Sequence, residues 1–291
     1  MKKIKYWIEA MRLRTLPVSV AGVITAIGYN ISSDTFKWLP ALLCLTFAVL
    51  CQIASNFANE YYDYKAGRDR IGREGPRRGV TEGDIAPTVM KRAIYAVLAA
   101  AALTGLSLTL WGGLWLTGAG ILIGAGVLAY STGPWPLSTH CLGEVAVVFF
   151  FGIIPVNLTY YVQSLQWSAD VFLGSLAIGL MGANVLIVNN YRDIADDIAV
   201  GKHTLATTFG RKAMLALYFC NALAAALFMW TVWAYNGIGW LAVPVAYLVC
   251  SAAVTTAIRR ADGARLTPFL GITAVLMLLY SVCFCVMCSM K

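Results

Sequence analysis

The sequence has little charge. Only 12% of its 291 residues are Asp, Glu, Lys or Arg, whereas 59% are hydrophobic. Soluble globular domains carry about 25% charged residues, so this composition excludes an ordinary soluble domain. Apolar runs long enough to cross a bilayer as helices recur along the whole chain. We expect an all-α integral membrane protein with nine transmembrane helices around a central cavity, as one membrane-embedded domain over residues 1–291. The expected spans are residues 15–32, 38–58, 92–111, 113–131, 142–162, 169–190, 213–235, 237–258 and 267–288.

The cysteines carry no recognisable chemistry. Seven of the eight lie inside apolar runs, where cysteine usually serves as a small buried hydrophobe. Cys283, Cys285 and Cys288 have no partnering His or Cys motif elsewhere in the sequence. We therefore predict neither a cysteine metal site nor disulfides.

The net charge of +8 is a topology signal, and it does not indicate nucleic-acid binding. With nine spans and the N-terminus in the cytoplasm, 20 of the 22 Lys and Arg residues fall in cytoplasmic segments. The first apolar run has no small-residue cleavage site, so we expect a retained helix there. The sequence predicts a multi-pass protein of the cell (inner) membrane, whose two acidic loops, 59–92 and 191–212, both face the cytoplasm.

Acidic residues are scarce, and nine of the fourteen lie in those two loops. Each loop begins with an Asn-x-x-x-Asp segment at the end of an apolar run, Asn59 to Asp63 and Asn189 to Asp193. A spacing of four places both side chains on one helical face. The two segments lie four spans apart, which suggests an internal repeat that brings them face to face across the cavity.

These segments have the composition of a site for a divalent cation and a polyanion. Magnesium prefers oxygen ligands and usually takes one or two carboxylates plus substrate phosphates. Basic side chains can neutralise the remaining phosphate oxygens. A charged loop is more often simply solvated, which is our interpretation of Asp196, Glu74 and Glu82. The candidate metal ligands are Asn59, Asp63, Asp69, Asn189 (or Asn190), Asp193 and Asp197, and the candidate diphosphate-binding residues are Asn59, Lys65, Arg77, Arg192 and Lys202.

Tyrosines lie beside these carboxylates. Electron-rich rings such as those of Tyr61 and Tyr191 can stabilise an allylic carbocation, although interfacial anchoring explains such tyrosines equally well. For Tyr130 we favour anchoring. We predict Asp63, Asp193, Tyr61 and Tyr191 as the catalytic residues.

The sequence resembles the UbiA superfamily of intramembrane aromatic prenyltransferases. Within it, the sequence is most similar to the branch that prenylates 1,4-dihydroxy-2-naphthoate. The segments that carry the resemblance are Leu13-Arg-Thr-Leu-Pro17, Asn59-Glu-Tyr-Tyr-Asp-Tyr64, Tyr130-Ser-Thr-Gly-Pro-Trp-Pro-Leu137 with Gly143-Glu144, and Asn189-Asn-Tyr-Arg-Asp193 through Gly201-Lys-His-Thr-Leu205.

The resemblance implies a magnesium-dependent reaction. The Asp residues and Mg2+ bind a polyprenyl diphosphate, which ionises to an allylic cation that the naphthoate ring attacks with loss of its carboxylate, giving demethylmenaquinone. The first loop departs from the family pattern between Arg70 and Arg77, so Arg73 and Arg78 stay alternatives to Arg77 as the phosphate partner. His203 stands where arginine is common, and we assign it no role.

Other functions fit the sequence less well. CDP-alcohol phosphotransferases also use paired Asp motifs, but in one compact block, whereas these clusters lie about 130 residues apart. A transporter would place ionisable groups near the bilayer midplane. Within the superfamily, 4-hydroxybenzoate and homogentisate stay alternative acceptors, and the sequence specifies neither prenyl length nor oligomeric state.

Overall fold

The computed structural model describes residues 2–290, and its regular elements are helical. Its one recorded β-bridge in that range joins His140 to His203. The elements are α1 (Lys2–Met11), η1 (Leu13–Thr15), α2 (Leu16–Ser32), α3 (Trp38–Lys65), α4 (Pro87–Gly112), α5 (Leu116–Ala129), η2 (Leu137–Thr139), α6 (Gly143–Val147), η3 (Val148–Ile153), α7 (Ile154–Ser164), α8 (Ala169–Arg192), α9 (Ile194–Ala199), α10 (Leu205–Phe228), α11 (Trp230–Tyr235), η4 (Ile238–Leu241), α12 (Ala242–Arg259), η5 (Gly263–Leu266) and α13 (Thr267–Ser289).

The expectation of an all-α membrane bundle is confirmed. Within residues 2–290, eight helical segments are long and apolar enough to cross a membrane. The fourth expected span, 113–131, falls on α5, which has only 14 residues. At 1.5 Å per residue such a helix is about 21 Å long, short of a bilayer core of about 30 Å. The count of nine full-length spans is therefore not confirmed.

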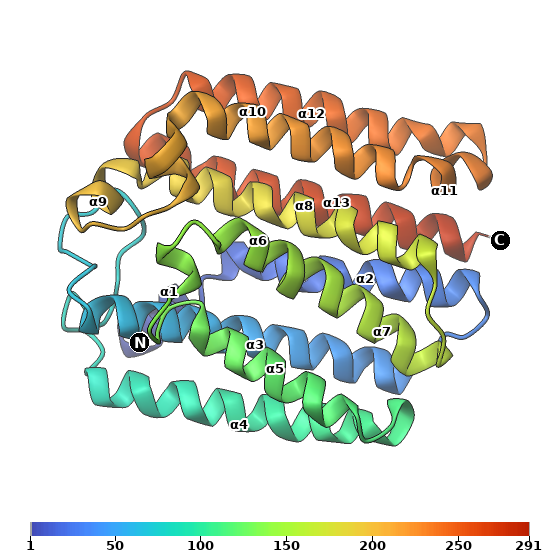
Figure 1. The fold of residues 1–291 in the computed structure, drawn as a ribbon, viewed down its shortest axis with the longest axis horizontal. Coiled ribbons are helices and arrows are strands. Elements are labelled where there is room, and N and C mark those ends of the chain that lie inside the picture. The colour runs from blue at the N-terminus through green and yellow to red at the C-terminus, as the bar shows by residue number, and fades with distance from the viewer. Residues whose placement is uncertain (1, 291) are drawn as a thin grey trace.

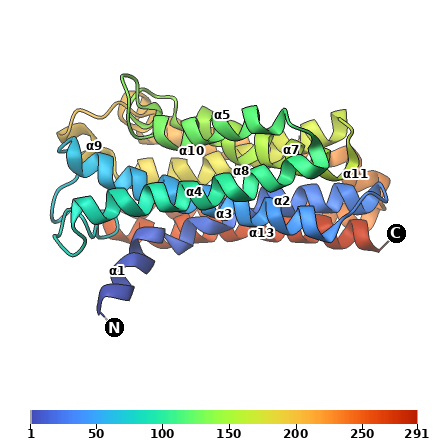
Figure 2. The same ribbon diagram turned by 90° about the horizontal axis from the view of Figure 1, so that it is seen from below.

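The long helices lie side by side with their axes roughly aligned (Figure 1). The segment between α3 and α4 lies with α9 and α1 at one end of this bundle, whereas the C-terminus lies at the other (Figure 1). Helix α1 projects away from the body of the bundle (Figure 2). This arrangement brings the ends of α3 and α8, and with them the two acidic segments, to the same end of the molecule.

Close helix contacts around α8 form the centre of the bundle. A methyl group at Gly152 of η3 would lie 2.4 Å from the Cα of Gly179 on α8, so only glycine permits this approach. Small residues at such contacts are the usual way for membrane helices to gain van der Waals contact. The segment η3 is a π-helix just before Pro155, and π-helical turns are often found at functional sites. Here it places Phe150 and Phe151 in the wall of an internal cavity.

Candidate active site

A polar cavity lies at the end of the bundle where α3 and α8 terminate. Its lining comes from both acidic segments, the loop after α3, the start of α2 and the start of α6. The lining includes six of the residues predicted to bind metal or diphosphate: Asn59, Asp63, Asp69, Asn189, Asp193 and Asp197, together with the predicted phosphate partner Lys202. Residues from opposite halves of the sequence thus share one cavity.

The first acidic segment is held by a hydrogen bond along one face of α3. Asn59 Nδ2 donates to Asp63 Oδ2 at 3.0 Å, as the spacing of four predicts. Both side chains are buried. The Oδ1 of Asn59 accepts hydrogen bonds from Arg12 and, at 3.4 Å, from Arg78. The amide therefore orients a carboxylate and two guanidinium groups at once.

The second segment has a similar arrangement at the end of α8. Asn189 Nδ2 lies 3.5 Å from Asp193 Oδ2, again across a spacing of four. Arg192 donates to both oxygens of Asp193, at 2.7 and 3.0 Å, and to Asn189 Oδ1 at 2.8 Å. Asp197, one turn further on, lies 3.4 Å from Lys202 Nζ. The neighbouring Asn190 points elsewhere, donating to Glu144 Oε1, so Asn189 is the asparagine that faces Asp193.

Arg73 joins the two segments directly. It donates to Asp69 Oδ1 at 2.7 Å and to Asp193 Oδ2 at 2.9 Å. Nearby, Arg70 pairs with Asp196, whose other oxygen accepts from the backbone N–H of Glu74 at 2.8 Å. The loop after α3 is thus fastened onto the end of α8 and the start of α9.

The electrostatic environment differs among three cavity carboxylates that lie outside the spanning helices, Asp69, Asp193 and Asp197. Burial raises the pKa of Asp69 to about 6; the charge of Asp63 adds to the rise, while Arg73 opposes it. Burial likewise raises the pKa of Asp197, against the attraction of Lys202. Burial acts in the same direction on Asp193, but the hydrogen bond and charge of Arg192, with the charge of Arg73, outweigh it and lower its pKa. Burial therefore favours the neutral form of Asp69 and Asp197, whereas the arginines keep Asp193 charged.

Three carboxylate oxygens in this cavity suit a divalent cation. Asp63 Oδ1, Asp69 Oδ2 and Asp197 Oδ2 are buried and have no hydrogen-bond partner. Arginine nitrogens lie 3.6 Å from the first two, beyond hydrogen-bond distance. A buried oxygen without a hydrogen bond is costly, and a hard cation would satisfy it. Among the described residues no three Asp, Glu, His or Cys side chains form a preassembled cluster.

Five predicted residues do not line the cavity. Lys65 is exposed at the end of α3, and Arg77 pairs with Asp84 while its guanidinium lies 5.2 Å over the ring of Tyr6. Tyr61 packs edge-on against Tyr62, and Tyr191 lies under Arg211 at 5.1 Å. The predicted phosphate-binding Arg192 is buried against Asp193 beside the cavity, and it too is absent from the lining.

Conversely, the cavity lining contains Arg12, Tyr130 and Glu144, to which the sequence assigned no binding role, and also Arg73 and Arg78. Arg73 and Arg78 were the alternatives to Arg77, and no local pattern distinguishes the three. The presence of Arg12 depends on the turn before α2, where Arg12 itself adopts a left-handed conformation with φ of 52°. The Gly143-Glu144 segment carried part of the resemblance, which was the one available signal for Glu144.

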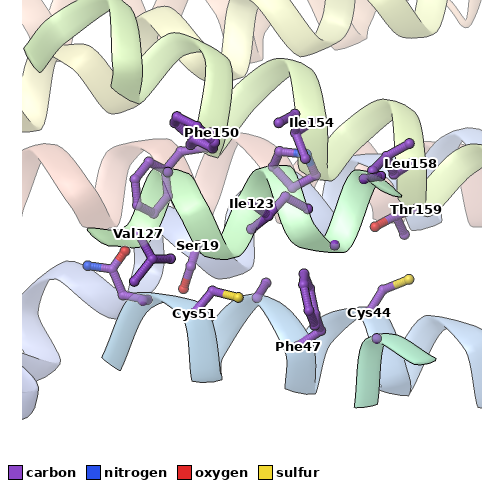
Figure 3. Close-up of a pocket in the computed structure, with 18 of the residues that line it drawn as sticks. Ser19, Cys44, Phe47, Cys51, Ile123, Val127, Phe150, Ile154, Leu158 and Thr159 are labelled. Atoms are coloured by element: carbon purple, nitrogen blue, oxygen red, sulfur yellow. The ribbon is translucent and has the colours of Figure 1, made fainter. Parts of the chain in front are cut away.

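An apolar cavity adjoins the polar one, and five residues line both: Gln52, Ser55, Tyr130, Val147 and Phe151. Phe47 from α3 and Phe150 from η3 extend into the apolar cavity from opposite sides (Figure 3). Gly105 of α4 makes room for Phe47, and Gly126 of α5 for Phe150. These two glycines shape the cavity wall, whereas Gly124 has open space beside its Cα.

The site is rich in carboxylates and guanidinium groups, and it continues into an apolar cavity between membrane-length helices. These two features together are typical of one class of membrane protein. Such a protein binds a ligand with a polyanionic head and an apolar tail inside the membrane. The chain belongs to the UbiA prenyltransferase family, whose model matches residues 20–268. It is accordingly a multi-pass membrane protein.

Curated relatives agree with this assignment. The chain is 34% identical to the 1,4-dihydroxy-2-naphthoate octaprenyltransferase of Haemophilus influenzae, over 82% of this chain and 80% of the relative. It is 33% identical to the protein of that name from Mycobacterium tuberculosis, over 94% of each chain.

Solved structures show the same fold. A UbiA homolog from Archaeoglobus fulgidus bound to DMAPP and Mg2+ matches with a TM-score of 0.69 at 17% identity, over 97% of this chain and 99% of that chain. The apo structure of a UbiA homolog from Aeropyrum pernix K1 matches with a TM-score of 0.70 at 16% identity, over 90% and 96% of the two chains.

Proposed function

We propose that this protein transfers a polyprenyl group from an allylic polyprenyl diphosphate to 1,4-dihydroxy-2-naphthoate. Diphosphate and CO2 are released, and the product is demethylmenaquinone, the precursor that menaquinone biosynthesis methylates. The observation that carries the proposal is the pair of acidic segments joined by Arg73 in a polar cavity that continues into an apolar one. The names of the curated relatives favour the naphthoate over other acceptors.

The polar cavity would hold the diphosphate. Asp63, Asp69 and Asp197 have the unpartnered oxygens that fit Mg2+, and Asn59 and Asn189 would orient Asp63 and Asp193. When bound, Mg2+ would neutralise the charge that develops on the departing diphosphate.

Guanidinium and ammonium groups would bind the diphosphate oxygens that do not contact the metal. Arg73, Arg78 and Lys202 line the cavity. The planar fork of arginine matches a phosphate bidentately. Arg73 would exchange part of its present pairing with Asp69 and Asp193 for the incoming anion. We therefore favour Arg73 over Arg77, which is paired with Asp84 away from the cavity.

The apolar cavity would hold the prenyl tail. Its wall is built mainly from aliphatic and aromatic side chains of α3, α5, η3 and α7. An isoprenoid tail has no polar groups to satisfy, so such a wall can bind it without desolvation cost. Tyr130 lines both cavities and so lies where the allylic cation would form, and its ring can stabilise the positive charge there.

An acceptor competition tests this function. The purified protein in lipid would receive Mg2+, farnesyl or geranylgeranyl diphosphate, and a mixture of 1,4-dihydroxy-2-naphthoate, 4-hydroxybenzoate and homogentisate. We expect one product by mass spectrometry, a prenylated naphthoquinol that lacks the carboxylate. Prenylation of a different acceptor would move the assignment to another branch of the family. No product with any acceptor, from folded protein, would overturn it.

A further inference from the structure

The cavity wall contains a buried carboxylate outside both acidic segments, that of Glu144. It is the second residue of α6, is 5% exposed and lines the polar cavity. Its recorded side-chain partner is Asn190, whose Nδ2 donates to Oε1 at 2.9 Å. Among the side chains described for residues 4–290, no Lys or Arg nitrogen lies within 4.0 Å of it, whereas Asp63, Asp69, Asp193 and Asp197 each have such a partner. Glu144 is therefore a buried acid held by a neutral amide, unlike the ion-paired carboxylates of the acidic segments.

Glu144 lies near the junction of the two cavities. Val147, one turn later on α6, lines both cavities, as does Tyr130. The hydroxyl of Tyr130 would lie 3.7 Å from a methyl group placed at Gly143, directly beside Glu144. Tyr130 also interacts electrostatically with Glu144, Asp63 and Asp197. The phenol therefore lies beside Glu144, and an aromatic acceptor that reaches the allylic carbon would pass next to this carboxylate.

We propose that Glu144 is a catalytic residue that accepts the proton of a ring hydroxyl of the acceptor while the ring attacks the prenyl group. This inference rests on the proposed function, because it requires an acceptor with a hydroxyl beside the attacked carbon. Glu144 is suited to the task because it is buried without an ion pair, so taking up a proton removes a buried charge. The hydrogen bond from Asn190 holds the carboxyl group in place.

The step balances as follows. The C–O bond of the prenyl diphosphate breaks, and the diphosphate leaves with the bonding electrons. The ring carbon that bears the carboxylate forms the new C–C bond, and the neighbouring hydroxyl becomes a carbonyl as its proton passes to Glu144. The carboxylate is now bonded to the carbon alpha to that carbonyl, as in a β-keto acid. The bond between this carbon and the carboxylate breaks, CO2 leaves, and the bonding electrons form an enolate. Glu144 returns the proton to the enolate oxygen, and no net proton is taken up or released.

The surroundings of Glu144 contribute two other titratable groups. Tyr130 comes from the end of α5, and Lys202, from the segment after α9, attracts the carboxylate. The packed faces of η2 and η3 contain no titratable side chain, and α8 faces Glu144 with the neutral Asn190. A pH dependence of kcat that disappears when Glu144 alone is substituted therefore belongs to Glu144. One that persists in that variant belongs to Tyr130 or Lys202.

Glu144→Gln tests the proposal, because it keeps the side chain's shape and an oxygen for Asn190 but removes the proton acceptor. In lipid with Mg2+, farnesyl diphosphate and 1,4-dihydroxy-2-naphthoate, we expect kcat to fall by about 100-fold or more near neutral pH. The deficit should shrink as the pH rises, because the acceptor hydroxyl then ionises without a base. Glu144→Asp should retain intermediate activity and the pH profile of the unaltered protein.

Two further measurements separate catalysis from structure. Binding of the unreactive farnesyl thiolodiphosphate with Mg2+ should be the same in Glu144→Gln and the unaltered protein. Glu82→Gln, the same change at a glutamate that lies 3.9 Å from Arg77 and does not line the cavity, should keep the original pH profile.

Three results would overturn the role of Glu144: a kcat within threefold of the unaltered protein, an equal deficit at every pH, or weakened analogue binding. The last two would assign Glu144 to the α6–α8 contact. Failure of the unaltered protein to prenylate the naphthoate would instead contradict the proposed function. The failure of the Glu144 role and the failure of the proposed function are thus distinguishable.

Discussion

Arg73 and Asp193, 120 residues apart in sequence, are joined by a hydrogen bond of 2.9 Å. The same guanidinium also binds Asp69, so one side chain crosses between the two acidic segments. Arg73 is only 12% exposed at its side chain, and removal of one partner from a buried ion pair typically costs about 3–5 kcal/mol. This contact sets the spacing of the carboxylates before any substrate arrives.

The first prediction concerns the two aspartates that end the Asn-x-x-x-Asp segments. Asp63→Asn and Asp193→Asn should each reduce turnover by at least about 100-fold, because each removes charge where metal and diphosphate would bind. Steady-state rates with the protein in lipid would measure this. Asp34→Asn is the matched control: Asp34 lies before α3, outside the cavity, with φ of 55°, which asparagine tolerates. Robust turnover by Asp63→Asn would remove the metal-site argument.

The arginines provide a second, paired test. Arg73→Lys keeps a positive charge but loses the fork that reaches Asp69 and Asp193. We expect the KM for prenyl diphosphate to rise about tenfold or more. Arg77→Lys, the same change in a half-exposed arginine outside the cavity, should leave the KM within about twofold. A larger rise of the KM in Arg77→Lys than in Arg73→Lys would assign the phosphate contact to Arg77, as the sequence alone suggested.

Magnesium should stabilise the folded protein as well as support turnover. A ligand at about 100 times its Kd adds about 2.7 kcal/mol to the free energy of unfolding. We expect Mg2+ with farnesyl thiolodiphosphate to raise the melting temperature, and EDTA to abolish both this rise and product formation. The melting temperature of Asp63→Asn should not respond, since Asp63 Oδ1 is one of the three buried oxygens without a hydrogen bond. An equal rise in that variant would place the metal elsewhere.

The apolar cavity is tested by two glycines of α5. A methyl group at Gly126 would lie 2.2 Å from Phe150 Cζ, so Gly126→Ala must displace that ring, which lines the cavity. We expect kcat/KM to fall more for geranylgeranyl than for geranyl diphosphate. Gly124→Ala is the control on the same helix, because no atom lies within 4 Å of a methyl group there. An unchanged ratio of the two substrates in Gly126→Ala would place the tail outside this cavity.

Membrane orientation gives the last prediction. Ile71, in the loop after α3, is 71% exposed, and Ile238, in η4, is 84% exposed. If the acidic loops face the cytoplasm, an impermeant thiol reagent added outside intact cells should label Ile238→Cys but not Ile71→Cys. Both should react after the cells are opened. Labelling of Ile71→Cys from outside would invert the topology.

Local patterns in the sequence were sufficient to predict much of the fold. Hydropathy located the long helices because a bilayer imposes a minimum apolar length on each one. It overestimated the segment 113–131, where the helix α5 covers only Leu116–Ala129. The chain then turns, and Ser131 lies within 3.3 Å of Asn59, in a polar contact that hydropathy does not register.

The sequence by itself determined the membrane class and the faces of the two acidic segments, since apolar length and a spacing of four are properties of a single helix. Only the tertiary structure decided which arginines of the loop after α3 line the cavity and which asparagine of α8 faces Asp193. It also decided that Glu144 meets Asn190. These outcomes depend on where one segment lies against another, and contacts across 46 or 120 residues leave no periodicity in the chain.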